Sequence, residues 1–127
     1  MAVMEGTRNV KSWIGSYDFA VDGGAISTIA FRSNDGPLPA GAVIVSGYID
    51  VTVACLSATG TIALQAEAAA DLLAATAQAG LTTGRKSIIP VATGATAVKT
   101  TVPRNPAIVI ATAAFTAGAF TVSLSYR

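Results

Sequence analysis

Histidine is absent from this chain of 127 residues, and cysteine occurs once, at Cys55. The chain therefore lacks the most common general base and the most common transition-metal ligand, and one cysteine cannot complete a zinc site. It also cannot form an intrachain disulfide, which is typical of assembly in a reducing compartment. Cys55 ends an apolar strand pattern, which favours a buried small residue over a reactive thiol. The sequence predicts a protein that is not an enzyme, with no catalytic residue, cofactor or metal.

Charge is also scarce. Only 12% of the residues are charged, against about 25% in an average soluble domain, while 52% are hydrophobic. No segment reaches the roughly 18 consecutive apolar residues of a membrane span, and a net charge of +1 gives no general attraction to nucleic acid or to an anionic membrane. Because a soluble chain with little charge has to cover its apolar surface, we expect it to be an assembly subunit that binds protein and neither nucleic acid nor membrane.

The few charges are unevenly distributed along the chain. All seven acids lie at or before Asp71, which gives that segment a net charge of −4, and the remainder carries +5 without a single acid. Folding either interleaves the two halves or leaves a polarised surface suited to head-to-tail contact. For the second case we predict a contact between bases of one subunit (Arg85, Lys86 and Arg104) and acids of the next (Asp50, Glu67 and Asp71).

Alternation of apolar and polar residues with a period of two dominates the sequence and predicts strands. The first is expected over Val10–Val21, with a hairpin partner over Ala25–Arg32 after the Asp22-Gly23-Gly24 turn. Further strands are expected at 43–53, 61–66, 86–91, 95–102, 107–113 and 119–126, with a loop at 33–41. In the strand at 43–53, Val43, Val45, Ile49, Val51 and Val53 are expected to share one face, with a bulge or bend at Gly47. Val51 and Phe120 are predicted to be buried on facing or adjacent strands.

One stretch departs from this period. Glu67–Ala79 is rich in alanine and is expected to form a short helix or an irregular excursion. About eight strands separated by frequent turns predict an all-β fold, a two-sheet antiparallel β-sandwich with at most one short helix, for which jelly-roll connections are one option. Residues 1–10 are expected to form an N-terminal arm that becomes ordered only against a neighbour, and residues 11–127 to form the sandwich domain.

Three stretches carry a family resemblance. GPLPAGAVIVSGYIDVTVA, residues 36–54, resembles the "LPAGA, then V-x-x-x-Y-V-D-V-T-T-A" stretch of small virion proteins of tailed bacteriophages. TIALQAEAAADLLAATA, residues 61–77, is similar to their "TI-x-L-G-x-E-x-x-x-DLLAAT" segment, and residues 115–122, FTAGAFTV, resemble their "LTAG-x-F-x-V" strand pair. Cys55 departs from the pattern, which has threonine or alanine there. The motifs consist of turns and alternating strands and carry no catalytic residues.

The resemblance implies a structural component of the virion. Our leading hypothesis is a capsid decoration protein, assembled in the host cytoplasm, that forms a homotrimer and binds the major capsid protein on the outer capsid surface. The alternative is a module of a phage tail or fibre that recognises a host glycan, for which Tyr48 is the aromatic residue expected to be exposed.

Overall fold

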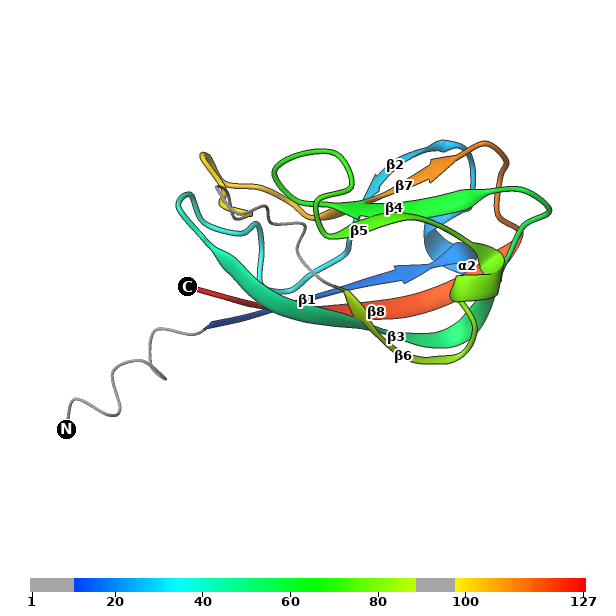
Figure 1. Cartoon of the computed structure of the whole chain (residues 1–127), viewed down its shortest axis with the longest axis horizontal. Coiled ribbons are helices and arrows are strands. Elements are labelled where there is room, and N and C mark those ends of the chain that lie inside the picture. Colours follow the sequence, from blue (N-terminus) through cyan, green and yellow to red (C-terminus); the bar gives the residue numbers. More distant parts are fainter. Residues whose placement is uncertain (1–10, 89–97) are drawn as a thin grey trace.

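The computed structural model describes residues 11–88 and 98–127 and contains two antiparallel four-stranded sheets packed face to face (Figure 1). The first, here called the long sheet, has the strand order β1 (Lys11–Asp18), β8 (Ala117–Tyr126), β3 (Ile44–Leu56) and β6 (Gly84–Ile88). The second, the short sheet, has the order β2 (Ser27–Ala30), β7 (Ala107–Ala111), β4 (Thr61–Gln65) and β5 (Leu73–Ala77). The prediction of a two-sheet antiparallel sandwich with about eight strands is confirmed.

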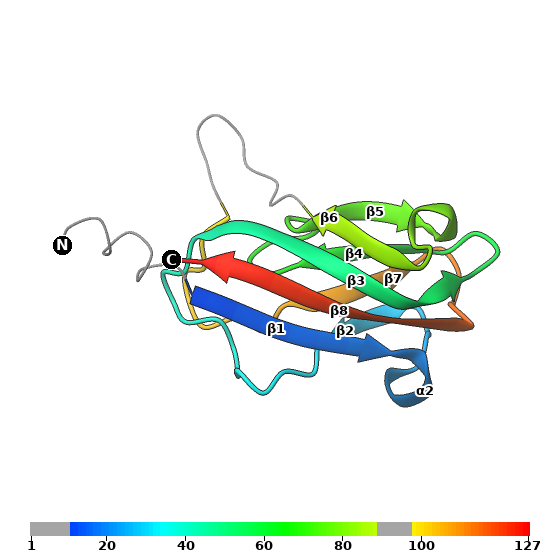
Figure 2. The same ribbon diagram turned by 90° about the horizontal axis from the view of Figure 1, so that it is seen from below.

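The two central strands of the long sheet come from distant parts of the chain. Figure 2 shows β8 lying between β1 and β3, so the last strand of the chain is flanked by two strands of its first half. In the short sheet β7 likewise lies between β2 and β4. The acidic first half and the basic second half of the sequence are therefore interleaved strand by strand.

The core lies between the sheets and is centred on the pairing of β3 with β8. Val51 is aligned with Phe120 across this pair, and the two side chains are 0% and 2% exposed. Tyr17 is aligned with Phe120 from the other side, and its ring lies 5.4 Å from that of Phe120. Val122 and Leu124 continue the buried face of β8. The predicted burial of Val51 and Phe120 on adjacent strands is confirmed.

Three irregularities of β3 change which of its residues face the core. Its register with β8 shifts between Ile44 and Ser46, between Val51 and Val53 and between Val53 and Leu56, and each shift inserts an unpaired residue in β3. A bulge reverses the alternation of faces on its far side. Ile44 is consequently buried, whereas Val45 and Val53 are about half exposed. The prediction that these two valines share a face with the buried Ile49 and Val51 is wrong, and the first bulge lies at Val45, two residues before Gly47.

The predicted hairpin after β1 does not form. β1 ends at Asp18, whose carboxylate accepts a hydrogen bond from the backbone N–H of Ala20 and caps a four-residue helical turn, α2 (Phe19–Asp22). Gly23, with a φ of 78°, then redirects the chain to the short sheet, where β2 pairs with β7. Only an isolated bridge, Ser16 to Arg32, joins the two segments that were predicted to pair.

The alanine-rich stretch contains a strand that the sequence did not predict. Residues 67–72 form an irregular loop, Leu73–Ala77 form β5 on β4, and a 3-10 turn, η2 (Gln78–Gly80), follows. Of the predicted strand at 95–102, residues 98–100 contribute only a bridge between Lys99 and Val43, and residues 95–97 lie outside the described residues. The predicted arm, 1–10, and residues 89–91 of the strand predicted at 86–91 also lie outside them.

Candidate interaction surfaces

The two side chains of the core that carry an acidic proton, those of Cys55 and Tyr17, are buried. The Cys55 thiol is 1% exposed, as predicted, and burial raises its pKa to about 11, so it stays protonated at neutral pH. Burial likewise raises the pKa of Tyr17 to about 12, and its hydroxyl donates a 2.6 Å hydrogen bond to the carbonyl of Gly23. Within residues 11–88 and 98–127, no three Cys, Asp or Glu side chains gather as metal ligands would. No helix in the same part of the chain has the length and hydrophobicity needed to cross a membrane.

Glu67 and Arg104, two of the predicted contact residues, bind each other within the chain. Arg104 Nε donates to Glu67 Oε1 at 2.9 Å, and a second guanidinium nitrogen lies 3.3 Å from Oε2. The backbone N–H and the hydroxyl of Thr101 donate to the same carboxylate at 3.1 and 2.9 Å. The pair ties the loop after β4 to the loop before β7, which links segments more than thirty residues apart in the sequence.

These hydrogen bonds lower the pKa of Glu67 from 4.5 to about 2, chiefly through Arg104 and then through Thr101. Because the folded pKa lies below the unfolded one, the unfolded chain takes up the proton first as the pH falls. We therefore expect the contribution of Glu67 to stability to be complete above about pH 4.5 and to disappear between pH 4.5 and 2. Thermal melts across this range should show a decline that is smaller in Glu67→Gln. An identical decline in both proteins would contradict this assignment.

Asp71 has a structural role in the same loop. Its side chain is buried, and one carboxylate oxygen accepts from the backbone N–H of Ala66 at 2.7 Å. The other accepts from the N–H groups of Glu67 and Ala68 at 3.0 and 2.8 Å. The bonds hold a tight loop in which Ala70 adopts a φ of 56°, a conformation that side-chain-bearing residues rarely adopt. Within one subunit, therefore, the Asp71 carboxylate already accepts three hydrogen bonds from the backbone of its own loop.

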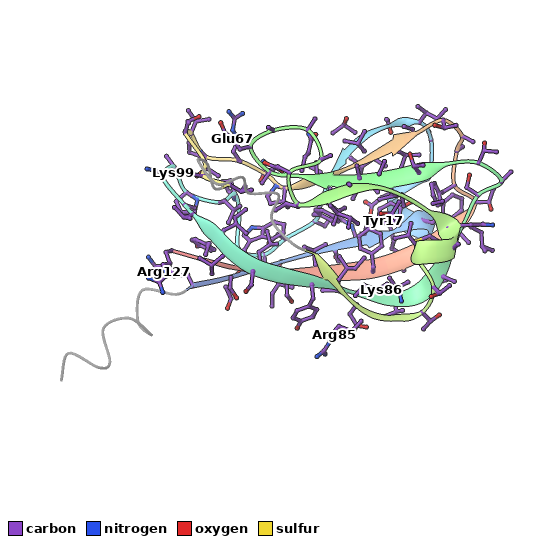
Figure 3. All side chains as sticks on the ribbon, viewed as in Figure 1. Tyr17, Glu67, Arg85, Lys86, Lys99 and Arg127 are labelled. Carbon is purple, nitrogen blue, oxygen red and sulfur yellow. The ribbon has the colours of Figure 1, made fainter. Side chains whose placement is uncertain are left out.

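The other three predicted contact residues lie on β3 and its edge neighbour β6 in the long sheet. Asp50 of β3 is aligned with Arg85 of β6, and Lys86 with the buried Ile49, so Arg85 and Lys86 are on opposite faces. Arg85 is exposed and points away from the sandwich (Figure 3). That these residues contact a second copy stays a prediction.

A shallow groove runs over the outer face of the long sheet. It has a volume of about 650 Å³ and is lined by Ser12, Ile14, Ser46, Gly47, Tyr48, Arg85, Ser123, Leu124 and Ser125. Ile14 is half exposed, and the Arg85 guanidinium lies 4.6 Å from the centre of the Tyr48 ring. We call this surface the Tyr48 face. Tyrosine and arginine are among the residues enriched at protein interfaces.

The short sheet carries no charge at all. None of the residues in β2, β7, β4 and β5 is Asp, Glu, Lys or Arg. Its outer face has only small or β-branched side chains in the row formed by Thr28, Val109 and Ala63. Sequence reasoning found the shortage of charge but not that one sheet would hold none. The absence of charge from all four strands can be read from the sequence only after Leu73–Ala77 is recognised as a strand.

The molecule is thus a β-sandwich whose candidate sites, in the part that the structure describes, are surfaces rather than a reactive centre.

No family model matches the sequence, and no curated protein matches it. Three solved structures are similar in fold, all from phage capsids. A chain of the cyanophage Pam1 capsid asymmetric unit has a TM-score of 0.58 and 23% identity, over 93% of this chain and 84% of that one. A chain of the acidic stable capsid of Helicobacter pylori bacteriophage KHP30 has a TM-score of 0.59 and 12% identity, over 92% and 86%.

The third is a chain of the capsid of Ralstonia phage GP4, with a TM-score of 0.60 and 16% identity, over 91% of this chain and 83% of that chain. At these identities the likeness is one of fold, and it extends over nearly the whole chain. In each case the matched chain is only slightly longer than this one, as the two coverages require.

Proposed function

We propose that this protein is a structural component of a phage virion, a decoration protein that binds the outer surface of the capsid shell. The observation that carries the proposal is the full-length fold likeness to chains of three phage capsids. Their small size supports an accessory chain, because each matched chain has room for little beyond one sandwich of this kind. The strand orders β1-β8-β3-β6 and β2-β7-β4-β5 support jelly-roll connections in this sandwich.

In this proposal the protein stabilises the shell by mass action. A chain that binds only the assembled shell lowers the free energy of that state by an amount that grows with its concentration. Binding across the joint between capsid subunits would then oppose their separation. The Tyr48 face and the uncharged short sheet supply surface for contacts between copies of this chain.

We further propose that the protein is a homotrimer. Closed cyclic symmetry covers an apolar surface without growth into filaments, and a three-fold ring fits the local three-fold positions of a capsid lattice. Exposed ion pairs between subunits would contribute little, about 0–1 kcal/mol each.

Sedimentation in a series of salt concentrations tests the trimer. Because about 1 M salt screens exposed charges almost completely, a trimer held by apolar surface should persist there. Dissociation at high salt would make charge pairs the main source of affinity. A monomer at every salt concentration, with and without shells, would contradict the trimer.

The alternative of a glycan-binding tail or fibre module depends on Tyr48. The guanidinium of Arg85 lies over its ring, in the position where the apolar face of a sugar would stack. This arrangement favours Tyr48 as part of a protein contact.

Cosedimentation with empty shells assembled from the major capsid protein of the same phage tests the decoration role. We expect the purified protein to pellet with the shells, to saturate and to raise their melting temperature, and not to pellet alone. Absence of binding, or a gene flanked only by tail genes, would contradict the proposal.

A further inference from the structure

Three exposed bases gather at one end of the sandwich. Lys11 begins β1 and is aligned with Tyr126, so it neighbours Arg127 at the end of β8. The backbone of Val43 exchanges two 2.9 Å hydrogen bonds with Arg127 and forms a bridge with Lys99 on its other side. Because neighbouring strands lie about 4.8 Å apart, the three backbones fall within about 15 Å. Figure 3 shows Lys99 and Arg127 at the same end of the molecule. We call this cluster the basic end.

None of these bases forms an ion pair with a described residue. The two ion pairs of the described chain are Arg32 with Asp22 and Arg104 with Glu67. Of the remaining described acids, Asp18 caps α2, Asp35 accepts from the N–H of Ile14 and Asp71 binds its own loop. Asp50 is aligned with Arg85 on the neighbouring strand.

The segments outside the description do not change this balance. Residues 89–97 contain no charged side chain, and residues 1–10 contain one acid and one base. The segments outside the described residues therefore add no net side-chain charge.

At the opposite end, which carries α2 and the β3–β4 turn (Figure 1), the described charges are mixed: Asp18 and the Asp22–Arg32 pair lie at α2, and Lys86 lies towards the same side of the molecule (Figure 3). The basic end differs from it in holding three bases that form no ion pair with a described residue. A local excess of one charge orients a protein as it approaches an oppositely charged partner.

From this geometry we propose that the basic end is the surface that docks on the shell, and that its partner is an acidic patch of a shell protein. The inference rests on the proposed decoration function and names the surface and the partner chemistry for it. Docking by one end leaves the Tyr48 face and the uncharged sheet free for contacts between copies.

The test is to neutralise the basic end with Lys11→Gln/Lys99→Gln/Arg127→Gln. A matched control, Ala20→Glu/Val21→Glu/Thr59→Glu, gives the same change in net charge at the opposite end, where these three side chains are exposed. We expect the first variant to bind shells at least about tenfold more weakly in 0.1 M salt, since three interface charges, each with a modest contribution, are removed together. We expect the control to bind within about twofold of the unmodified protein. Both should keep its melting temperature and oligomeric state.

The salt dependence of binding is a second measurement. Raising the salt from about 0.1 to 1 M should weaken binding of the unmodified protein about tenfold and that of the neutralised variant much less. Equal binding by the unmodified protein and the neutralised variant, or binding insensitive to salt, would contradict docking by the basic end. The proposed decoration role would be unaffected. Failure of the unmodified protein to bind shells would overturn both. Competition by duplex DNA that depends on the same three bases would assign the cluster to nucleic acid instead.

Discussion

Replacing Phe120 with alanine is expected to destabilise the fold by about 3–5 kcal/mol, the range observed when a buried aromatic side chain is truncated. The Phe120 ring is 2% exposed and lies 5.4 Å from the ring of Tyr17 and 5.9 Å from that of Phe31. Phe31 belongs to the segment that leads from the short sheet back towards β1, so the cavity would open where the two sheets meet. Little can collapse into it, because Val51 and Tyr17 are fixed by strand pairing on both sides.

Urea denaturation at neutral pH measures this loss. Val53→Ala is the matched control, because it removes an apolar group from the strand next to Phe120 but at a site that is 51% exposed. Its expected cost is below about 1 kcal/mol. Equal losses in the two variants would mean that the core is not centred on Phe120.

The sequence predicted the sheets well where alternation is regular and poorly where it is interrupted. In β8 the buried residues Phe120, Val122 and Leu124 follow the period of two without a break. In β3 the bulges near Val45 and Val53 reverse the faces, and a bulge is set by pairing with β8, which local sequence does not encode.

Two elements were missed for reasons of context. Alanine favours helices, yet Leu73–Ala77 is a strand because it completes the short sheet beside β4, and pairing overrides propensity. The opposite happens after Asp18: the apolar period continues to Val21, but the carboxylate of Asp18 caps a helical turn and leaves Val21 exposed.

The sequence predicted that the protein has interaction surfaces, but it did not predict where on the fold they lie. Low charge and excess apolar content indicated a protein that packs against others, and the uncharged short sheet agrees with this. The pairing of Glu67 with Arg104 was not predictable, because it depends on two loops meeting across the fold. The basic end is likewise made by Lys11, Lys99 and Arg127, which only the topology brings together.

The loop between β4 and β5 depends on one carboxylate, and Asp71→Ala is expected to destabilise the protein by about 2–4 kcal/mol. The substitution leaves the backbone N–H groups of Ala66, Glu67 and Ala68 without their acceptor. Each buried donor that loses its partner costs about 1–3 kcal/mol, and water reaching the more exposed Ala68 reduces the total.

Asp71→Asn sharpens the test because it keeps the shape of the side chain. Its amide has one oxygen that accepts and one nitrogen that only donates, so one side of the loop would face donor against donor. We expect Asp71→Asn to lose most of the stability that Asp71→Ala loses, whereas Asp50→Asn, on the outer face of the long sheet, should cost less than about 1 kcal/mol. Chemical denaturation of the three variants measures the difference. Equal losses at positions 71 and 50 would show that the three hydrogen bonds do not stabilise the loop. A loss confined to Asp71→Ala would show that one acceptor oxygen is enough.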